Sequence, residues 1–162
     1  MTSECSISGC GRPAAPGVRL CHEHLDRVDA ACEAAAEGAQ SEPDPADPYD
    51  LLVMEYTAKI SRSGQMRGLA MALVEGGVRT ARESFPDLKQ LPSQLADEIS
   101  SFLAVSVVSA VIQERAHLLA RAKMLAEVLP AEQAAGIERA IEEEMRSLDE
   151  GDESVLLKGG AP

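Results

Sequence analysis

Aromatic residues are scarce in this sequence. They make up 2% of its 162 residues, and tryptophan is absent. The strands of β-proteins favour aromatic and β-branched side chains, so this scarcity disfavours a β-sandwich. Hydrophobic residues still account for 45% of the chain, so a sizeable core can form. That core is expected to be aliphatic and rich in alanine, which suits helices packed on helices. We therefore predict an all-α fold.

Positive charge is also scarce. Fifteen Lys and Arg residues face 27 Asp and Glu residues, which gives a formal net charge of −12. Such a chain repels nucleic acid and anionic membranes unless its basic residues gather in one place. Residues 29–50 contain seven acids and no base. Before them lie the weak candidates for nucleic-acid contact, Arg12, Arg19 and Arg27, which form no strong basic patch.

Residues typical of common active sites are missing. The chain has three histidines and no asparagine. No glycine-rich phosphate loop follows a predicted strand, and no Ser or Cys lies in a recognisable nucleophile elbow. His117 has neither a nucleophile nor a second base placed with it, so it is not a catalytic candidate. We expect no enzymatic activity.

Signals for export and for membrane insertion are missing as well. The N-terminus has no apolar stretch of the kind that a secretory signal needs, so we expect a cytoplasmic protein. The apolar segment from Phe102 to Ile112 is shorter than the roughly 20 residues that cross a bilayer. We expect no membrane association. The segment instead indicates a helix that is buried on most sides, either within a helical bundle or across a dimer interface.

Cysteine and histidine are few, but most of them lie together near the N-terminus. Cys5 and Cys10 form a Cys-x4-Cys pair, and after ten residues Cys21 and His24 form a Cys-x2-His pair. Structural zinc sites use four Cys or His ligands in closely spaced pairs of this kind. The Pro and Gly residues between the pairs favour turns, which let the chain return. We therefore predict a structural Zn²⁺ site with these four residues as ligands.

Helical geometry separates these ligands from their neighbours. The pattern becomes helical at Cys21, so Cys21 and His24 share one face of the first turn. His22 points about 100° away from Cys21 and is the weaker choice of fourth ligand. Cys32 is roughly 16 Å further along the helix and cannot reach the same ion. Disulfides or free thiols are the alternatives, and an iron–sulfur cluster is disfavoured because it would need Cys32.

The segment CSISGCGRPAAPGVRLCHEHLDR resembles the short C-x4-C…C-x2-H zinc module of actinobacterial and actinophage proteins. The resemblance covers only about residues 5–27. It implies that Cys5, Cys10, Cys21 and His24 are the metal ligands. Some proteins with this module carry an HNH nuclease or a DNA-binding domain behind it. An HNH nuclease needs further His and Asn residues, so the resemblance implies no nuclease activity for this chain.

Turn signals divide the rest of the chain. We predict a zinc-binding module with a trailing helix, an acidic proline-rich linker, a helical domain and a flexible tail, over residues 1–38, 39–47, 48–150 and 151–162. Asp47 is the expected N-cap of the first helix of the helical domain, with Pro48 at its first position. That helix should weaken or break at Gly76-Gly77, because glycine costs about 1 kcal/mol relative to alanine. Helices are expected over about 48–84, 93–129 and 131–148.

The length of the second of these helices favours self-association. A helix of about 36 residues is roughly 54 Å long, which exceeds what a monomeric domain of this size needs. We expect a homodimer or higher oligomer with Leu95 to Val128 at or near the interface. The functional hypothesis is a non-enzymatic zinc-binding interaction or regulatory adaptor with a protein partner. The alternatives are a nucleic-acid-binding regulator that uses the zinc module, and a phage or cellular assembly protein.

Overall fold

The computed structural model of the protein describes residues 4–7, 9–39, 44, 46–84 and 93–150. Within these ranges the fold is all-α, as predicted, with one isolated β-bridge between Glu4 and Pro13. The predicted tail and most of the predicted linker lie outside the described residues. The helices are α1 (His22–Gly38), α2 (Pro48–Ser61), α3 (Gly64–Ser84), α4 (Ser93–Val128) and α5 (Ala131–Glu150).

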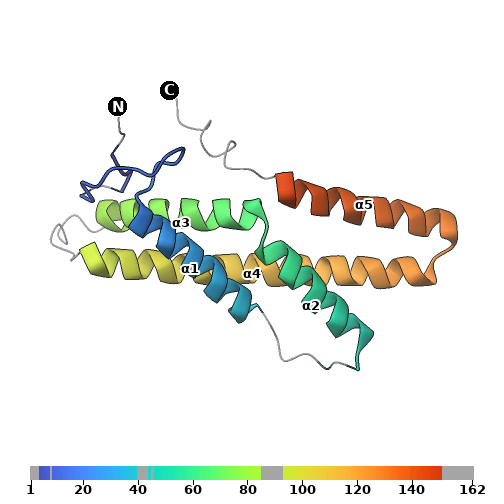
Figure 1. Ribbon diagram of the computed structural model, residues 1–162. Coiled ribbons are helices and arrows are strands. Elements are labelled where there is room, and N and C mark those ends of the chain that lie inside the picture. Colours follow the sequence, from blue (N-terminus) through green and yellow to red (C-terminus); the bar gives the residue numbers. More distant parts are fainter. Residues whose placement is uncertain (1–3, 8, 40–43, 45, 85–92, 151–162) are drawn as a thin grey trace.

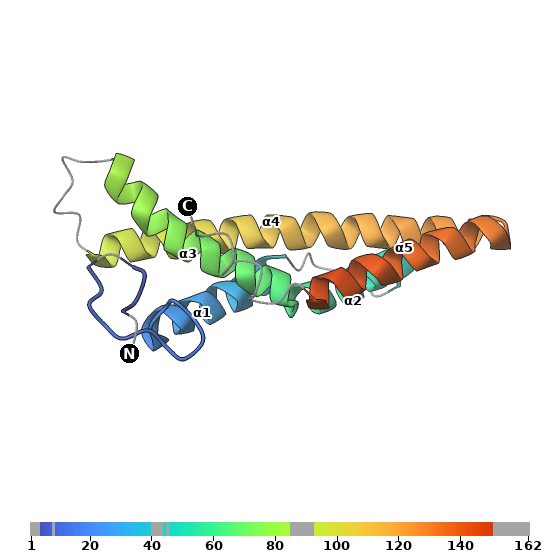
Figure 2. The same cartoon turned by 90° about the horizontal axis from the view of Figure 1, so that it is seen from above.

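The longest helix, α4, is the element on which the other four pack. In Figure 1, α1 and α2 cross in front of it, α3 runs beside its N-terminal half, and α5 returns beside its C-terminal half. Seen from above in Figure 2, α1, α2 and α5 all lie on the same side of α4. The opposite side of its C-terminal half is covered by no described helix.

Several helix ends follow local sequence signals. Asp47 is the N-cap of α2, where its side chain accepts a hydrogen bond of 2.8 Å from the Tyr49 N–H. Pro48 occupies the first helical position, where no N–H is needed. Pro130 lies between α4 and α5. Proline has no N–H to donate to the preceding helical turn, and its ring clashes with that turn, so α4 ends before it. These positions confirm the predicted start of α2 and the predicted boundary between α4 and α5.

The single helix predicted over residues 48–84 is wrong, because the chain breaks at Arg62 and Ser63. The Ser63 N–H donates to the Ile60 carbonyl at 3.0 Å and so closes the end of α2. The Ser63 hydroxyl then accepts from the Met66 N–H at 3.4 Å, at the start of α3. Serine is favoured at such a position because its side-chain oxygen accepts a hydrogen bond from a backbone N–H of the first helical turn. One buried serine therefore serves both helices.

The break predicted at Gly76-Gly77 does not occur, since α3 is continuous through both residues. The two glycines differ in surroundings. A Cβ atom on Gly77 would lie 2.9 Å from the Ser100 Oγ and 3.3 Å from the Ser100 Cα, whereas one on Gly76 would have nothing within 4 Å. Gly77 thus lets α3 approach α4 closely. The packing of α3 against α4 offsets the low helix propensity of glycine.

One aliphatic core joins the N-terminal loop to the helices. Leu20 of the loop, Val28 of α1, Ile60 of α2, Ile112 of α4 and Leu148 of α5 are fully buried and belong to the same cluster. Small side chains on α4 let the other helices approach it closely. Four alanines of α4 are fully buried: Ala96, Ala104, Ala116 and Ala120. The zinc module and the helical domain distinguished in the sequence therefore share a core.

The apolarity of α4 extends further than the sequence prediction counted. Residues 99–113 carry no charge, so the apolar segment is longer than Phe102 to Ile112. Among the described helices, α4 is the one that is long and apolar enough to cross a membrane, by length and composition only. Length alone therefore does not exclude a span. The core helix of a soluble protein passes the same test.

Candidate metal centre

The N-terminal loop folds back so that its two cysteines face the start of α1. The Cys5 N–H donates to the Arg12 carbonyl, and the Ser6 N–H donates to the Arg19 carbonyl, both at 2.8 Å. These bonds tie the first arm of the loop to the arm that leads into α1. Gly11 follows Cys10 with a φ of 64°, a conformation that residues with a Cβ rarely adopt. Glycine at this point makes the turn behind Cys10.

The four predicted ligands converge on one point, and together they form the Cys–His cluster. The Sγ atoms of Cys5, Cys10 and Cys21 and a ring nitrogen of His24 all lie within 4.8 Å of one another. The Cys21 Sγ is 3.2 Å from the His24 Nδ1 and 3.7 Å from the Cys10 Sγ. The Cys5 Sγ is 3.5 Å from the same nitrogen. A zinc tetrahedron with Zn–S bonds of about 2.3 Å has edges of about 3.7 Å, so the spacing suits such an ion.

The structure distinguishes His24 from His22, and the cluster cysteines from Cys32. His24 is buried in the first turn of α1, whereas His22 is exposed to solvent. Cys32 lies further along α1, half-buried and outside the cluster. All four cysteines of the chain are free thiols, so no disulfide competes with metal binding. The helical spacing that favoured His24 over His22 agrees with this geometry.

The start of α1 favours the ionised form of one cluster thiol. Burial opposes ionisation of Cys21, but the backbone amide and the ring of His24, together with Cys10, lower its pKa from 9.0 to about 7. Burial raises the pKa of Cys10 above its ordinary value. The thiolate is the form of cysteine that binds metal. Cys21 is therefore readily deprotonated near neutral pH and suited to be a ligand.

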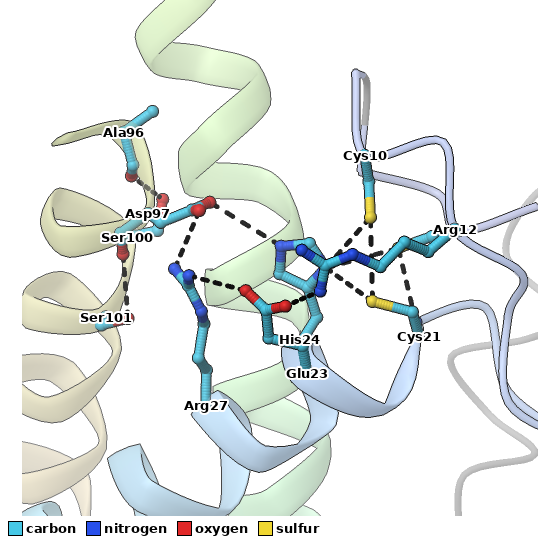
Figure 3. Close-up of polar contacts among 11 residues, drawn as sticks. Cys10, Arg12, Cys21, Glu23, His24, Arg27, Ala96, Asp97, Ser100 and Ser101 are labelled. Carbon is cyan, nitrogen blue, oxygen red and sulfur yellow. Dashed lines mark hydrogen bonds and ion pairs between the residues drawn. The ribbon is translucent and has the colours of Figure 1, made fainter. Parts of the chain in front are cut away.

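Asp97 of α4 lies on the other side of the His24 ring. Its Oδ1 is 3.7 Å from the His24 Nε2, and its Oδ2 accepts from the Arg27 guanidinium at 2.9 Å. Figure 3 shows Asp97 between these two residues, with Cys10 and Cys21 on the far side of the ring. A carboxylate on the second nitrogen fixes the tautomer and orientation of a metal-binding histidine. Here Asp97 lies on the Nε2 side of the ring, and the Nδ1 atom faces the cysteine Sγ atoms.

Sequence reasoning missed Asp97. Its spacing from the Cys–His cluster carries no signal, because the contact depends on how α1 packs against α4. A single acid at the start of a helix is usually solvated, whereas the Asp97 side chain is only 13% exposed. Burial of a carboxylate beside a cation and a ring nitrogen marks it as part of the centre.

Replacing Asp97 by asparagine should weaken metal binding by about 10- to 100-fold, the usual effect of removing a partner of a metal-binding histidine. The amide keeps the shape of the side chain but loses its charge. Competition with a chromophoric zinc chelator would measure the change. Glu98→Gln is the matched control, because it removes an exposed carboxylate one residue away. Equal affinities of the two variants would contradict a role for Asp97 in orienting His24.

Carboxylates pair with Arg12 and Arg27, two of the weak candidates for nucleic-acid contact. Arg12 and Arg27 both form ion pairs with Glu23, and Arg27 also pairs with Asp97. Arg19 is exposed in the loop. Local neutralisation of Arg12 and Arg27 weakens their attraction for phosphates. The geometry therefore gives the nucleic-acid alternative little support.

His117 lies apart from the Cys–His cluster. Its Nδ1 shares a hydrogen bond of 2.8 Å with the Tyr49 hydroxyl, and the two rings stack with centroids 5.9 Å apart. The pair joins the first turn of α2 to α4. Within the described part of the chain, the Cys–His cluster is the one group of three or more side chains that could hold a metal ion.

The assignment of this centre rests on its own geometry and donor chemistry. The resemblance of residues 5–27 to the actinobacterial zinc module stays a prediction. No protein-family model, no curated protein and no solved structure matches the chain.

Proposed function

We propose that this protein is a non-enzymatic zinc-binding adaptor or regulator whose helices form an oligomer. The observation that carries the proposal is the convergence of Cys5, Cys10, Cys21 and His24 on one point. Four protein ligands fill a tetrahedral site and leave no position for water or substrate. A site of that kind stabilises structure. It does not activate a nucleophile.

The donor set favours zinc over other ions. Thiolates and imidazole are soft or borderline ligands, which Mg²⁺ and Ca²⁺ do not prefer. A [2Fe–2S] or [4Fe–4S] cluster on four thiolates would need Cys32, which lies outside the Cys–His cluster. Three thiolates with one imidazole instead form a common structural zinc site. Four free thiols also suit a reducing compartment such as the cytoplasm.

Zinc in this position would hold the exposed loop as a fixed surface. The loop between Cys10 and Leu20 is mostly exposed, and its two ends are joined through the cluster and the backbone bonds described above. His24 connects it through Asp97 to α4. A surface fixed in this way loses little conformational entropy when it binds a partner. A protein partner is favoured over nucleic acid, because Arg12 and Arg27 are already paired and the net charge is −12.

Zinc content tests the proposal directly. Protein purified without chelator should carry one zinc per chain by native mass spectrometry. Cobalt substitution should give the visible absorption of a tetrahedral thiolate site. Cys32→Ser should leave both results unchanged, since Cys32 is outside the cluster. Metal-free protein that keeps its fold and takes up neither ion would overturn the proposal.

The assembly alternative gains support from α4. Eight of its large apolar side chains are exposed, including Phe102, Leu118 and Val128. A monomer rarely leaves so much apolar surface in contact with water. Assembly through this helix is compatible with an adaptor role.

A further inference from the structure

The uncovered side of α4 carries a continuous row of exposed residues, here named the α4 stripe. Its members are three or four residues apart, so they lie within roughly 80° of the helix circumference. Figure 2 shows that one side of the C-terminal half of α4 is covered by no described helix. Six of its members are apolar and two are charged, and all eight are exposed: Leu103, Val107, Ala110, Glu114, Leu118, Arg121, Leu125 and Val128.

The α4 stripe exposes apolar area of the size that marks an interaction site. Its five large apolar side chains are 38–78% exposed: Leu103, Val107, Leu118, Leu125 and Val128. Exposed apolar patches of about 300–600 Å² on soluble proteins are often functional contacts.

The two charges on the α4 stripe have no partner within the described part of the chain. Glu114 and Arg121 are exposed, seven residues apart, and neither forms an ion pair there. Their neighbours along the stripe are apolar, namely Ala110, Leu118 and Leu125. Two opposite charges isolated in an apolar row are unusual for a solvated helix face, where i, i+4 pairs are common.

We infer that a second copy of this chain covers the α4 stripe, with the two α4 helices antiparallel about a two-fold axis between His117 and Leu118. A two-fold interface is self-complementary, so a contact between two positions occurs twice. This register places Glu114 against Arg121 of the partner subunit, and the reverse. Val107 then faces Val128 of the partner subunit, and Ala110 faces Leu125 of the partner subunit. Over residues 107–128, apolar residues meet apolar residues and opposite charges meet. Leu103 lies beyond the end of the partner's α4.

A parallel arrangement and a membrane both fit these residues less well. In a parallel pair in register, Glu114 would face Glu114 of the partner subunit, which is unfavourable. In a bilayer, an acid and a base near the middle of the helix would each cost about 3 kcal/mol. The net charge of −12 also opposes approach to anionic lipid. The second copy explains both the apolar area and the charges.

This inference rests on the oligomer in the proposed function and gives that oligomer a surface and a register. The test of this inference does not depend on zinc binding, because Glu114 and Arg121 lie outside the Cys–His cluster. Zinc content is therefore measured on every variant. Loss of dimer with zinc retained bears on the α4 stripe alone, and loss of zinc bears on the metal centre.

Charge reversal tests the register. Glu114→Arg and Arg121→Glu should each raise the dimer dissociation constant by about 100-fold, because each creates two like-charge contacts. The double variant should restore the dimer. Mixing the two single variants should also give a dimer, since Arg faces Glu at both contacts of the mixed pair. Sedimentation velocity at several concentrations measures each case, with circular dichroism to verify that the helices are intact.

A matched control is Glu142→Arg, which reverses an exposed acid on α5, away from the α4 stripe. It should leave the dimer unchanged. A wild-type protein that is monomeric at tens of micromolar would overturn the inference. A dimer whose dissociation constant is unchanged by Glu114→Arg would also overturn it. Failure of the mixed variants to associate would overturn the antiparallel register. Wild-type protein that cosediments with phosphatidylcholine–phosphatidylglycerol vesicles and is monomeric without them would assign the α4 stripe to a membrane.

Discussion

Replacement of Cys21 by serine should abolish tight zinc binding and lower the melting temperature by about 10 °C. A metal that binds only the folded state stabilises it by about 4 kcal/mol when its free concentration is 1,000 times its dissociation constant. For a domain of this size, 1 kcal/mol corresponds to about 2–4 °C. Serine is nearly the same size as cysteine, but its hydroxyl does not ionise near neutral pH. The change therefore removes a ligand with little change in packing.

Cys32→Ser is the matched control for this prediction. It makes the same chemical change on the same helix, at a half-buried position outside the Cys–His cluster. Calorimetry with and without a chelator separates the two effects. The chelator should lower the melting temperature of wild type and of Cys32→Ser, and leave that of Cys21→Ser unchanged. A Cys21→Ser protein that still responds to chelator would contradict the assignment of Cys21 as a ligand.

Alanine at Gly77 and alanine at Gly76 should change stability in opposite directions. Gly77→Ala should destabilise the fold by about 1–3 kcal/mol, because its Cβ would lie 3.3 Å from the Ser100 Cα and neither helix backbone can move freely. Gly76→Ala should stabilise it by up to about 1 kcal/mol, since its Cβ meets nothing within 4 Å and alanine favours helix. Urea unfolding at one fixed protein concentration measures both.

A double-mutant cycle with Ser100→Gly tests the cause of the Gly77 effect. Removing the Ser100 side chain takes away the two nearest atoms that a Cβ on Gly77 would meet. Gly77→Ala should then cost less in the Ser100→Gly background than in wild type. Additive effects would show that the two positions do not contact each other. Stabilisation by Gly77→Ala alone would refute the close approach of α3 to α4.

The parts of the structure that sequence predicted correctly depend on neighbours along the chain. Cys21 and His24 are three residues apart on one helix, so helical spacing alone separated His24 from His22. Asp47 and Pro130 mark helix boundaries through effects on their own backbone. The scarcity of aromatic residues pointed to an aliphatic all-α core. Each of these signals acts over a few residues or over the whole composition.

The parts that sequence missed depend on contacts between helices. Asp97 belongs to the metal centre only because α1 packs on the first turns of α4. Gly77 is tolerated inside a helix only because Ser100 lies against it. Ser63 looks like an ordinary polar residue until its bonds to both neighbouring helices are known. No single segment carries these facts, so periodicity and propensity could not supply them.

The shared core limits how this candidate metal centre could be transferred between proteins. A zinc finger that folds alone can be copied into a new chain with its function intact. Here Val28, Ala31 and Ala35 of α1 are buried in a core that α2, α3 and α4 help to form. A fragment of residues 4–39 would present these side chains to water. Recombination that moved the centre would therefore have to carry the helices that cover α1, and the two would be inherited as one unit.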